Sequence, residues 1–425
     1  MWEKFKQIWT VPELRKSILF VLGMLVLFRF VAHIPVPGVD LVKLRLFLES
    51  NQVFGLLNIF SGGTFENFSV VLMGVAPYIT ASIILQLLQM IVPQLEELGK
   101  EGEQGQQKIN QYTRLLAVPL ALLQSYGMIT LLRTSAQGVI GDLSAFQIIT
   151  IMITITGGTM FLMWIGELIS EKKIGNGISL LIFAGIVSSL PTYAQQLYAT
   201  YDQSQLFDTV LFVALALITI IGVVVITQGQ RNIPVQYARQ MRGTRMTAAS
   251  TSFLPLKVNM AGVIPIIFAI SMILFPPMIA QFLVKAKTAW IVSAAEWVIR
   301  TFQNQLVYGV IYFLLVIGFT FFYTAVIFQP DKVAENLQKQ GGFIPGIRPG
   351  TATSAYLGQV MVRIVLAGAL FLGIIAVLPL AVQQFLTHTR SLVVGGTSLL
   401  IVVSVAIEIV NQIDAQLTMR QYDRV

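Results

Sequence analysis

Few residues in this 425-residue chain could perform chemistry, and none of them forms a recognisable catalytic motif. The chain has no cysteine, which excludes thiol catalysis, thiolate metal sites and disulfides. Its two histidines, His33 and His388, do not belong to an H-E-x-x-H zinc motif. The glycine-containing run Gly99–Glu103 lacks the G-x-x-x-x-G-K-[ST] spacing that cradles phosphates. We therefore expect no metal, no cofactor, no nucleotide hydrolysis and no enzymatic activity.

One carboxylate, Glu408, lies inside an apolar run. Acidic residues at membrane depth often mark coupling sites of ion-driven transporters. Glu408 is close to the end of its run, however, which favours an ordinary carboxylate at the membrane interface. The alternative is an ion-coupled small-molecule permease built from inverted repeats, and that function would require Glu408.

The composition is that of a membrane protein with many spans. Hydrophobic residues make up 55% of the chain and charged residues 11%, whereas a soluble protein carries roughly 25% charged residues. A membrane-spanning helix needs about 20 apolar residues. Ten runs approach or reach that length: 17–34, 70–91, 113–132, 147–166, 177–195, 208–226, 260–282, 306–327, 360–380 and 392–412.

The basic residues alternate between the loops in a way that fits ten spans. Most of the 28 lysines and arginines fall in loops on the side of the N-terminus. Because cytoplasmic loops are enriched in Lys and Arg, both termini are expected in the cytoplasm. Residues 1–16 place Trp2, Phe5 and Trp9 at helical spacing among basic residues, which predicts an amphipathic helix at the membrane surface.

Two long cytoplasmic loops are expected, at 227–258 and 329–356. The first contains Arg231, Arg239, Arg242 and Arg245 and no acidic residue. The second contains the glycine- and proline-rich run Gly341–Gly350, which cannot form one continuous helix. Both loops should project from the membrane and offer surfaces to partners.

The stretch from Gly55 to Ser69 is too short and too irregular to cross the membrane. It begins with a brief apolar piece, is broken at Ser61–Gly63, and continues through a polar patch before the second full apolar run. Irregular backbone at membrane depth is tolerated only where it lines a cavity or is buried in protein. The stretch therefore predicts a half-inserted segment beside a pore or a binding cavity, or else an ordinary external loop.

The sequence resembles the SecY family of bacterial protein-conducting channels over nearly its whole length. Eight motifs carry the resemblance, in the same order and at matching places among the ten spans. They are Ile34–Asp40, Pro77–Ile84, Lys100–Glu103 with Gln111–Arg114, Gly175–Ser179, Ile233–Ala238, Asn259–Pro265, Gly341–Gly350 and Gly395–Ile401.

The resemblance implies an all-α membrane fold of two inverted, pseudosymmetric halves. Residues 17–195 would form the N-terminal half with spans one to five, and residues 208–412 the C-terminal half with spans six to ten. The half-inserted stretch at 55–69 would be the plug that closes the channel from outside. Its central residues are Asn58, Ile59, Phe60, Ser61, Gly62, Gly63, Thr64 and Phe65.

In such channels a ring of aliphatic side chains closes the narrowest point of the pore. The matching residues here, which we call the collar, are Ile79, Ile83, Ile178, Ile182, Ile267 and Ile401. A dry aliphatic ring excludes ions by dewetting, and it can close around any unfolded chain because it forms no directional bonds. Two pairs in this set are four residues apart, so each pair shares a helix face.

The resemblance also implies a lateral gate between spans two and three on one side and spans seven and eight on the other. Thr80, Gln124 and Asn259 match its polar cluster. Hydrogen bonds between membrane helices are worth on the order of 1 kcal/mol each, so an apolar signal sequence could displace them. The same three residues could instead be static contacts between helices.

The partners implied by the resemblance act on the cytoplasmic loops and around the spans. The four arginines of the first loop would face ribosomal RNA phosphates or acidic protein surfaces, and Arg348 in the second loop would act in motor-driven transport. The expected partners are a ribosome, the SecA motor ATPase, small SecE-like and SecG-like subunits, membrane lipid and an unfolded polypeptide bearing a signal sequence. The expected location is the bacterial plasma membrane.

Overall fold

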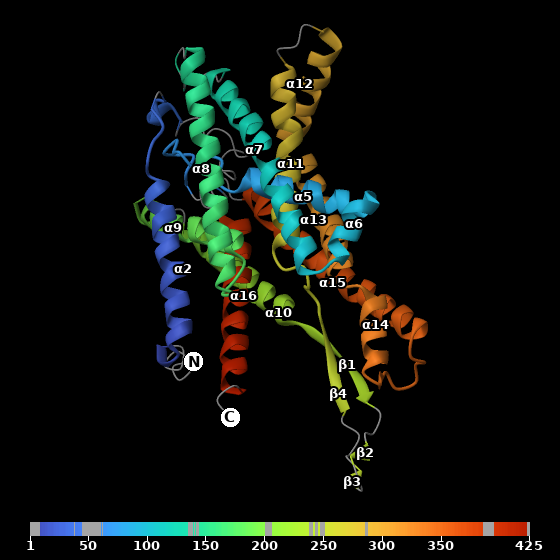
Figure 1. The fold of residues 1–425 in the computed structure, drawn as a ribbon. Helices are drawn as coiled ribbons and strands as arrows, with labels where there is room; N and C mark the ends of the chain where they lie inside the picture. The colour runs from blue at the N-terminus through green and yellow to red at the C-terminus, as the bar shows by residue number, and fades with distance from the viewer. Residues whose placement is uncertain are drawn as a thin grey trace.

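The described part of the chain is built mostly from long helices, and a three-stranded and a two-stranded sheet project away from them (Figure 1). This is a computed structural model, and it gives bounds for the elements of most of the chain. The residues that it describes are 9–37, 39–44, 61, 63–134, 139, 141, 144–199, 206–237, 241–242, 245–246, 251–284, 288–385 and 395–422.

Each of the ten predicted apolar runs coincides with a helix in the described part of the chain. The all-α membrane fold is therefore confirmed, and the helices fit a count of ten spans. They are α2 (Pro12–Val31), α5 (Ala76–Ile91), α7 (Glu103–Thr134), α8 (Ala145–Glu171), α9 (Gly177–Ala199), α10 (Leu206–Gln228), α11 (Ile264–Leu283), α13 (Gln305–Ile327), α15 (Thr351–Phe385) and α16 (Gly395–Tyr422).

By length and hydropathy alone, four of the described helices could cross a membrane unaided. Their qualifying segments are Ala145–Glu171, Gln305–Lys339, Thr351–Leu378 and Ser398–Met419. A fifth is the pair of α5 and α6 (Pro93–Lys100), which are bent by 101° at Val92. The bend has a local cause, because Val92 is extended with ψ 110° and precedes Pro93, and a proline disfavours the helical conformation in the residue before it.

The second span is shorter than the sequence predicts. The apolar run starts at residue 70, but the helix begins only at Ala76, and residues 70–75 form turns. Gly74 has φ +54°, a left-handed conformation that ends regular structure there. Pro77 then occupies the first turn of α5, where its missing N–H costs no hydrogen bond.

The helices pack in two sets that correspond to the two predicted halves. Helices α2, α5, α7, α8 and α9 contact one another, as do α10, α11, α13, α15 and α16. The two sets meet where α11 contacts α5 and α7, and where α16 contacts α9. Both contact regions therefore involve helices that carry predicted site residues.

The two predicted cytoplasmic loops contain more regular structure than expected. The first contains β1 (Gln230–Tyr237), β2 (Met241–Arg242), β3 (Arg245–Met246) and β4 (Thr251–Lys257), and the second contains α14 (Pro330–Lys339), β5 (Gly342–Phe343) and the first turn of α15. β1 pairs antiparallel with β4 from Gln230↔Lys257 to Gln236↔Thr251, and β5 adds to its other side at Gln236↔Phe343. The prediction of no continuous helix at Gly341–Gly350 does not conflict with these strands. Their pairing could not be predicted, because glycine and proline act locally whereas β1 and β5 are about a hundred residues apart.

The predicted surface helix at 1–16 falls largely outside the described residues, which begin at Trp9. Within them, Pro12 already begins α2, so Glu13–Lys16 form the first turn of the first span helix.

Candidate functional site

The collar residues meet in one buried cluster although they come from four helices. Ile79 and Ile83 lie on α5, Ile182 on α9, Ile267 on α11 and Ile401 on α16. All five are buried, at 8%, 4%, 3%, 6% and 0% exposure, and all belong to the same hydrophobic cluster. α5 and α9 are in the N-terminal set and α11 and α16 in the C-terminal set, so the cluster joins the two halves.

Ile178, the sixth predicted collar residue, is only partly buried and packs at the edge of this cluster. A Cβ placed on Gly166 of α8 would lie 2.8 Å from the Cδ1 atom of Ile178. Ile178 therefore fills the space left by that glycine.

The predicted plug lies only partly in the described residues: Asn58–Phe60 and Gly62 fall outside them. Ser61, Thr64 and Phe65 are buried, and the Oγ1 atom of Thr64 lies 3.2 Å from the carbonyl oxygens of both Ser61 and Leu72. Gly63 lies beside Ser189 of α9. The described part of the segment is thus folded into the protein, as irregular backbone at membrane depth must be.

The turns that follow the plug are held against α2 and α8. The Val36 N–H donates to the Phe68 carbonyl at 2.8 Å, and the Val70 N–H donates to the Ile34 carbonyl at 3.0 Å. On the other side, a Cβ on Gly158 of α8 would lie only 2.1 Å from the Val70 carbonyl oxygen. A glycine is required at this position for α8 to approach so closely.

Two of the predicted lateral-gate residues lie on helices that contact α11, Thr80 on α5 and Gln124 on α7, and Asn259 lies shortly before α11. The Thr80 hydroxyl donates to the Ala76 carbonyl of its own helix at 3.0 Å. The Asn259 amide donates to the Gly262 carbonyl at 3.2 Å, and its buried Oδ1 has no hydrogen-bond partner among the described residues. Gln124 is 6% exposed. Within the described residues, the hydrogen bonds of Thr80 and Asn259 thus stay inside their own half.

Two of the five predicted docking residues, Arg231 and Arg348, lie in what we call the cytoplasmic unit after its predicted location, formed by β1, β4, β5, α14 and the start of α15. Its core includes Ile233, Leu256, Leu337 and Leu357, so strands of the first loop pack on helices of the second. Arg231 and Arg348 are exposed on this unit. Arg242 and Arg245 face each other as partners in the β2–β3 hairpin at its far tip (Figure 1), and Arg239 lies outside the described residues.

One acidic residue of the cytoplasmic unit is paired with a base. Lys339 lies 2.7 Å from Glu335 on the exposed face of α14. The hydrogen bond and the charge of Lys339 hold the pKa of the Glu335 carboxyl below its ordinary value. The second acidic residue of α14, Asp331, accepts a hydrogen bond from the Ser354 hydroxyl at 2.5 Å, and Arg231 and Arg348 are exposed elsewhere on the unit.

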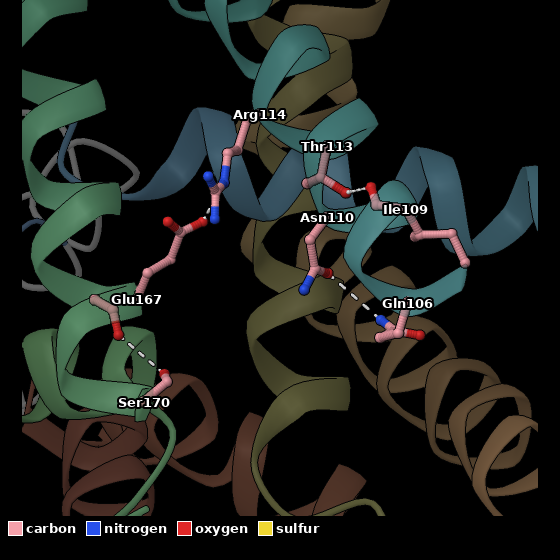
Figure 2. A network of polar contacts seen from close by, with 8 residues as sticks. Gln106, Ile109, Asn110, Thr113, Arg114, Glu167 and Ser170 are labelled. Carbon is pink, nitrogen blue, oxygen red and sulfur yellow. Dashed lines mark hydrogen bonds and ion pairs between the residues drawn. The ribbon is translucent and has the colours of Figure 1, made fainter. Parts of the chain in front are cut away.

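Sequence reasoning missed the contacts that hold the helices of each half together. They include the close approach of α8 to Val70 at Gly158 and an ion pair between Arg114 of α7 and Glu167 of α8 (Figure 2). The Gly157–Gly158 pair and the Gln111–Arg114 motif are visible signals. Neither of them says which helix lies opposite.

A buried aliphatic cluster that joins two sets of apolar helices fits the fold of a membrane channel. Solved channel structures have this fold. One is described as the structure of a protein-conducting channel, with a TM-score of 0.63 and 16% identity over 96% of this chain and 92% of that one. Another is the canine ribosome–channel complex of Sec61 from the endoplasmic reticulum, with a TM-score of 0.60 and 16% identity over 96% and 92%.

The family follows from closer relatives. The SecY family model matches residues 69–410. Protein translocase subunit SecY of Halalkalibacterium halodurans is 44% identical over 99% of both chains, and the same subunit of Mycobacterium tuberculosis is 44% identical over 97% of this chain and 96% of its own. This chain belongs to the SecY family.

Proposed function

We propose that this chain is the pore subunit of a protein translocase, which passes unfolded secretory polypeptides across the membrane and releases apolar segments sideways into lipid. The observation that carries the proposal is the collar. Isoleucines from both halves converge in one buried cluster, so a separation of the halves would open a path there. The permease alternative is not favoured, because the chain belongs to the SecY family.

In the proposed cycle, a partner first docks on the cytoplasmic unit. A signal sequence then enters between α5–α7 and α11, where no hydrogen bond of Thr80 or Asn259 recorded among the described residues crosses the gate. The plug moves aside and the polypeptide threads the collar. An aliphatic ring suits this task because it seals against ions when closed and binds no particular sequence when open.

The energy for movement comes from partners in this proposal, which gives the chain itself no catalytic role. A ribosome and the SecA motor would dock at Arg231, Arg239, Arg242, Arg245 and Arg348. SecE-like and SecG-like subunits would surround the spans in the bacterial plasma membrane, with both termini of this chain in the cytoplasm. The exposed basic strand and loop support such docking, because arginine forms paired hydrogen bonds with phosphate and carboxylate groups.

Site-specific crosslinking tests the proposed function directly. The chain has no cysteine, so a cysteine at Ile83 would be unique. We expect it to form a disulfide with a cysteine in a translocation-arrested secretory polypeptide. A cysteine at Met90, exposed on the same helix, serves as the control and should not react. If Ile83, Ile182 and Ile401 positions all fail to crosslink in a translocating preparation, the collar is not the path.

Arg348→Glu is expected to slow motor-driven translocation several-fold without lowering the amount of folded protein. Arg348 is exposed, and the loop that presents it is fixed by a 2.8 Å hydrogen bond from the Thr353 hydroxyl to the Arg348 carbonyl. Reversing an exposed interface charge mainly slows association and changes its dependence on salt. The measurement is the translocation rate in vesicles at two salt concentrations, with Lys332→Glu on α14 as the control. An unchanged rate removes Arg348 from the docking site.

A further inference from the structure

An ion pair joins two membrane helices of the N-terminal half. The Arg114 Nε atom on α7 donates to the Glu167 Oε1 atom on α8 at 2.6 Å, across 53 residues of sequence (Figure 2). Glu167 is 22% exposed and Arg114 47%. Tyr78 of α5 lies within electrostatic range of both charges. The contact therefore sits where three helices of the half approach one another.

α8 is in turn fixed to α9. The Ser170 hydroxyl donates to the Gly166 carbonyl at 2.9 Å, and its oxygen accepts from the Gly177 N–H at 2.9 Å. A Cβ on Gly177 would lie 1.8 Å from the Gly166 carbonyl oxygen, so the backbones of the two helices touch. Because α9 carries Ile182, a chain of contacts runs from α7 through α8 to the collar.

α7 also contacts α11, which belongs to the C-terminal set of helices. This is the contact that the proposed lateral gate would open. The two contacts of α7 therefore have different places in the fold: the ion pair joins α7 to α8 within the N-terminal half, whereas α11 meets α7 from the other half.

We propose that the Arg114–Glu167 ion pair is a positioning element of the gate, which makes α7 move with α8 and α9 as one body. Opening then takes place between α7 and α11, and Ile182 moves together with the gate helix. Without the pair, an entering segment could instead part α7 from α8, which would open a gap that does not lead to the collar. This inference rests on the proposed channel function, but its structural part can be tested without transport.

The test measures distances between spin labels in the complete, membrane-embedded protein. Leu123 on α7, Trp164 on α8 and Met272 on α11 are exposed, and the absence of cysteine allows each pair of positions to be labelled uniquely. In the unaltered chain, adding a synthetic signal peptide should lengthen the 123–272 distance. The 123–164 distance should remain in one narrow peak.

In the Arg114→Gln and Glu167→Gln variants, the narrow 123–164 peak should be lost. The signal peptide should also lengthen the 123–272 distance by less than it does in the unaltered chain. The exchanged variant, Arg114→Glu with Glu167→Arg, should regain both, because the opposite charges are again paired. Residues in direct contact commonly show such coupling, which changes an equilibrium constant by roughly twofold to a hundredfold. Lys100→Glu breaks a pair of the same 2.6 Å length that lies within α6 alone, and it should change neither distance.

A narrow 123–164 peak that survives in both glutamine variants would overturn the proposal, as would an exchanged variant that behaves like the single charge changes. If the single variants do not fold, recovery of folding by the exchanged pair supports the pairing, and failure of recovery contradicts it. Failure of the proposed function would look different. The 123–164 peak would still depend on the pair, but no signal peptide would change the 123–272 distance.

Discussion

Replacing Ile83, Ile182 and Ile401 with asparagine is expected to raise the ion conductance of the resting channel at least roughly tenfold, because a hydrophobic constriction gates by dewetting. These residues are 4%, 3% and 0% exposed and lie in the cluster that joins the two halves. Amide groups there would hold water and offer ligands to ions, so the closed pore would remain wet. The measurement is the conductance of the purified channel in planar bilayers without any substrate.

The matched control replaces the same three residues with leucine. Leucine keeps the number of carbon atoms and the apolar surface, and such exchanges usually cost less than about 1.5 kcal/mol each. Buried amides cost about 1–3 kcal/mol each when unpaired, so the folded fraction must be measured in parallel by thermal unfolding. A folded asparagine variant that is as tight to ions as the leucine variant would show that these isoleucines do not form the seal.

Gly158→Ala is expected to destabilise the protein by about 1–3 kcal/mol, the usual cost of an added methyl group in a packed core. The new Cβ would lie 2.1 Å from the Val70 carbonyl oxygen and 2.8 Å from its carbonyl carbon, so backbone must move rather than a side chain. Val70 belongs to the turns between the plug and α5, and these turns are hydrogen bonded to residues after α2. The substitution should therefore also raise the resting ion leak by displacing the base of the plug.

Gly157→Ala is the matched control, one residue away on the same helix. Nothing lies within 4 Å of a Cβ at Gly157, so the change should be neutral or stabilising by up to about 1 kcal/mol through helix propensity. Thermal unfolding in detergent and bilayer conductance measure the two effects. Equal unfolding temperatures for the two alanine variants would mean that α8 does not approach Val70 so closely.

Much of this architecture can be predicted from the sequence, because each local signal has a local cause. The ten apolar runs coincide with helices since a segment in lipid must satisfy its own backbone hydrogen bonds, and a helix does so. Helix starts are marked in the same way. Ser144 and Gln147 form a capping box at α8, and the Asn304 side chain accepts from the Leu306 and Val307 N–H groups at α13.

Motif resemblance predicts the collar isoleucines, and five of the six lie in one buried cluster, with Ile178 at its edge. That they form the seal of a pore stays a prediction. Residues spaced by four on a helix share a face, and this follows from Ile79 and Ile83 alone. That Ile267 and Ile401 meet them does not follow from any spacing in the sequence. It depends on how α11 and α16 pack against α5 and α9.

The sequence by itself determined where the chain is helical, that it belongs in a membrane, and which chemistry it lacks. Only the tertiary structure decided that β5 of one cytoplasmic loop pairs with β1 of the other, that Gly158 admits the Val70 carbonyl, and that Arg114 meets Glu167. The physical reason is range. Hydropathy, capping and proline act within a few residues, whereas these contacts join segments 53 to more than 100 residues apart, which only packing brings together.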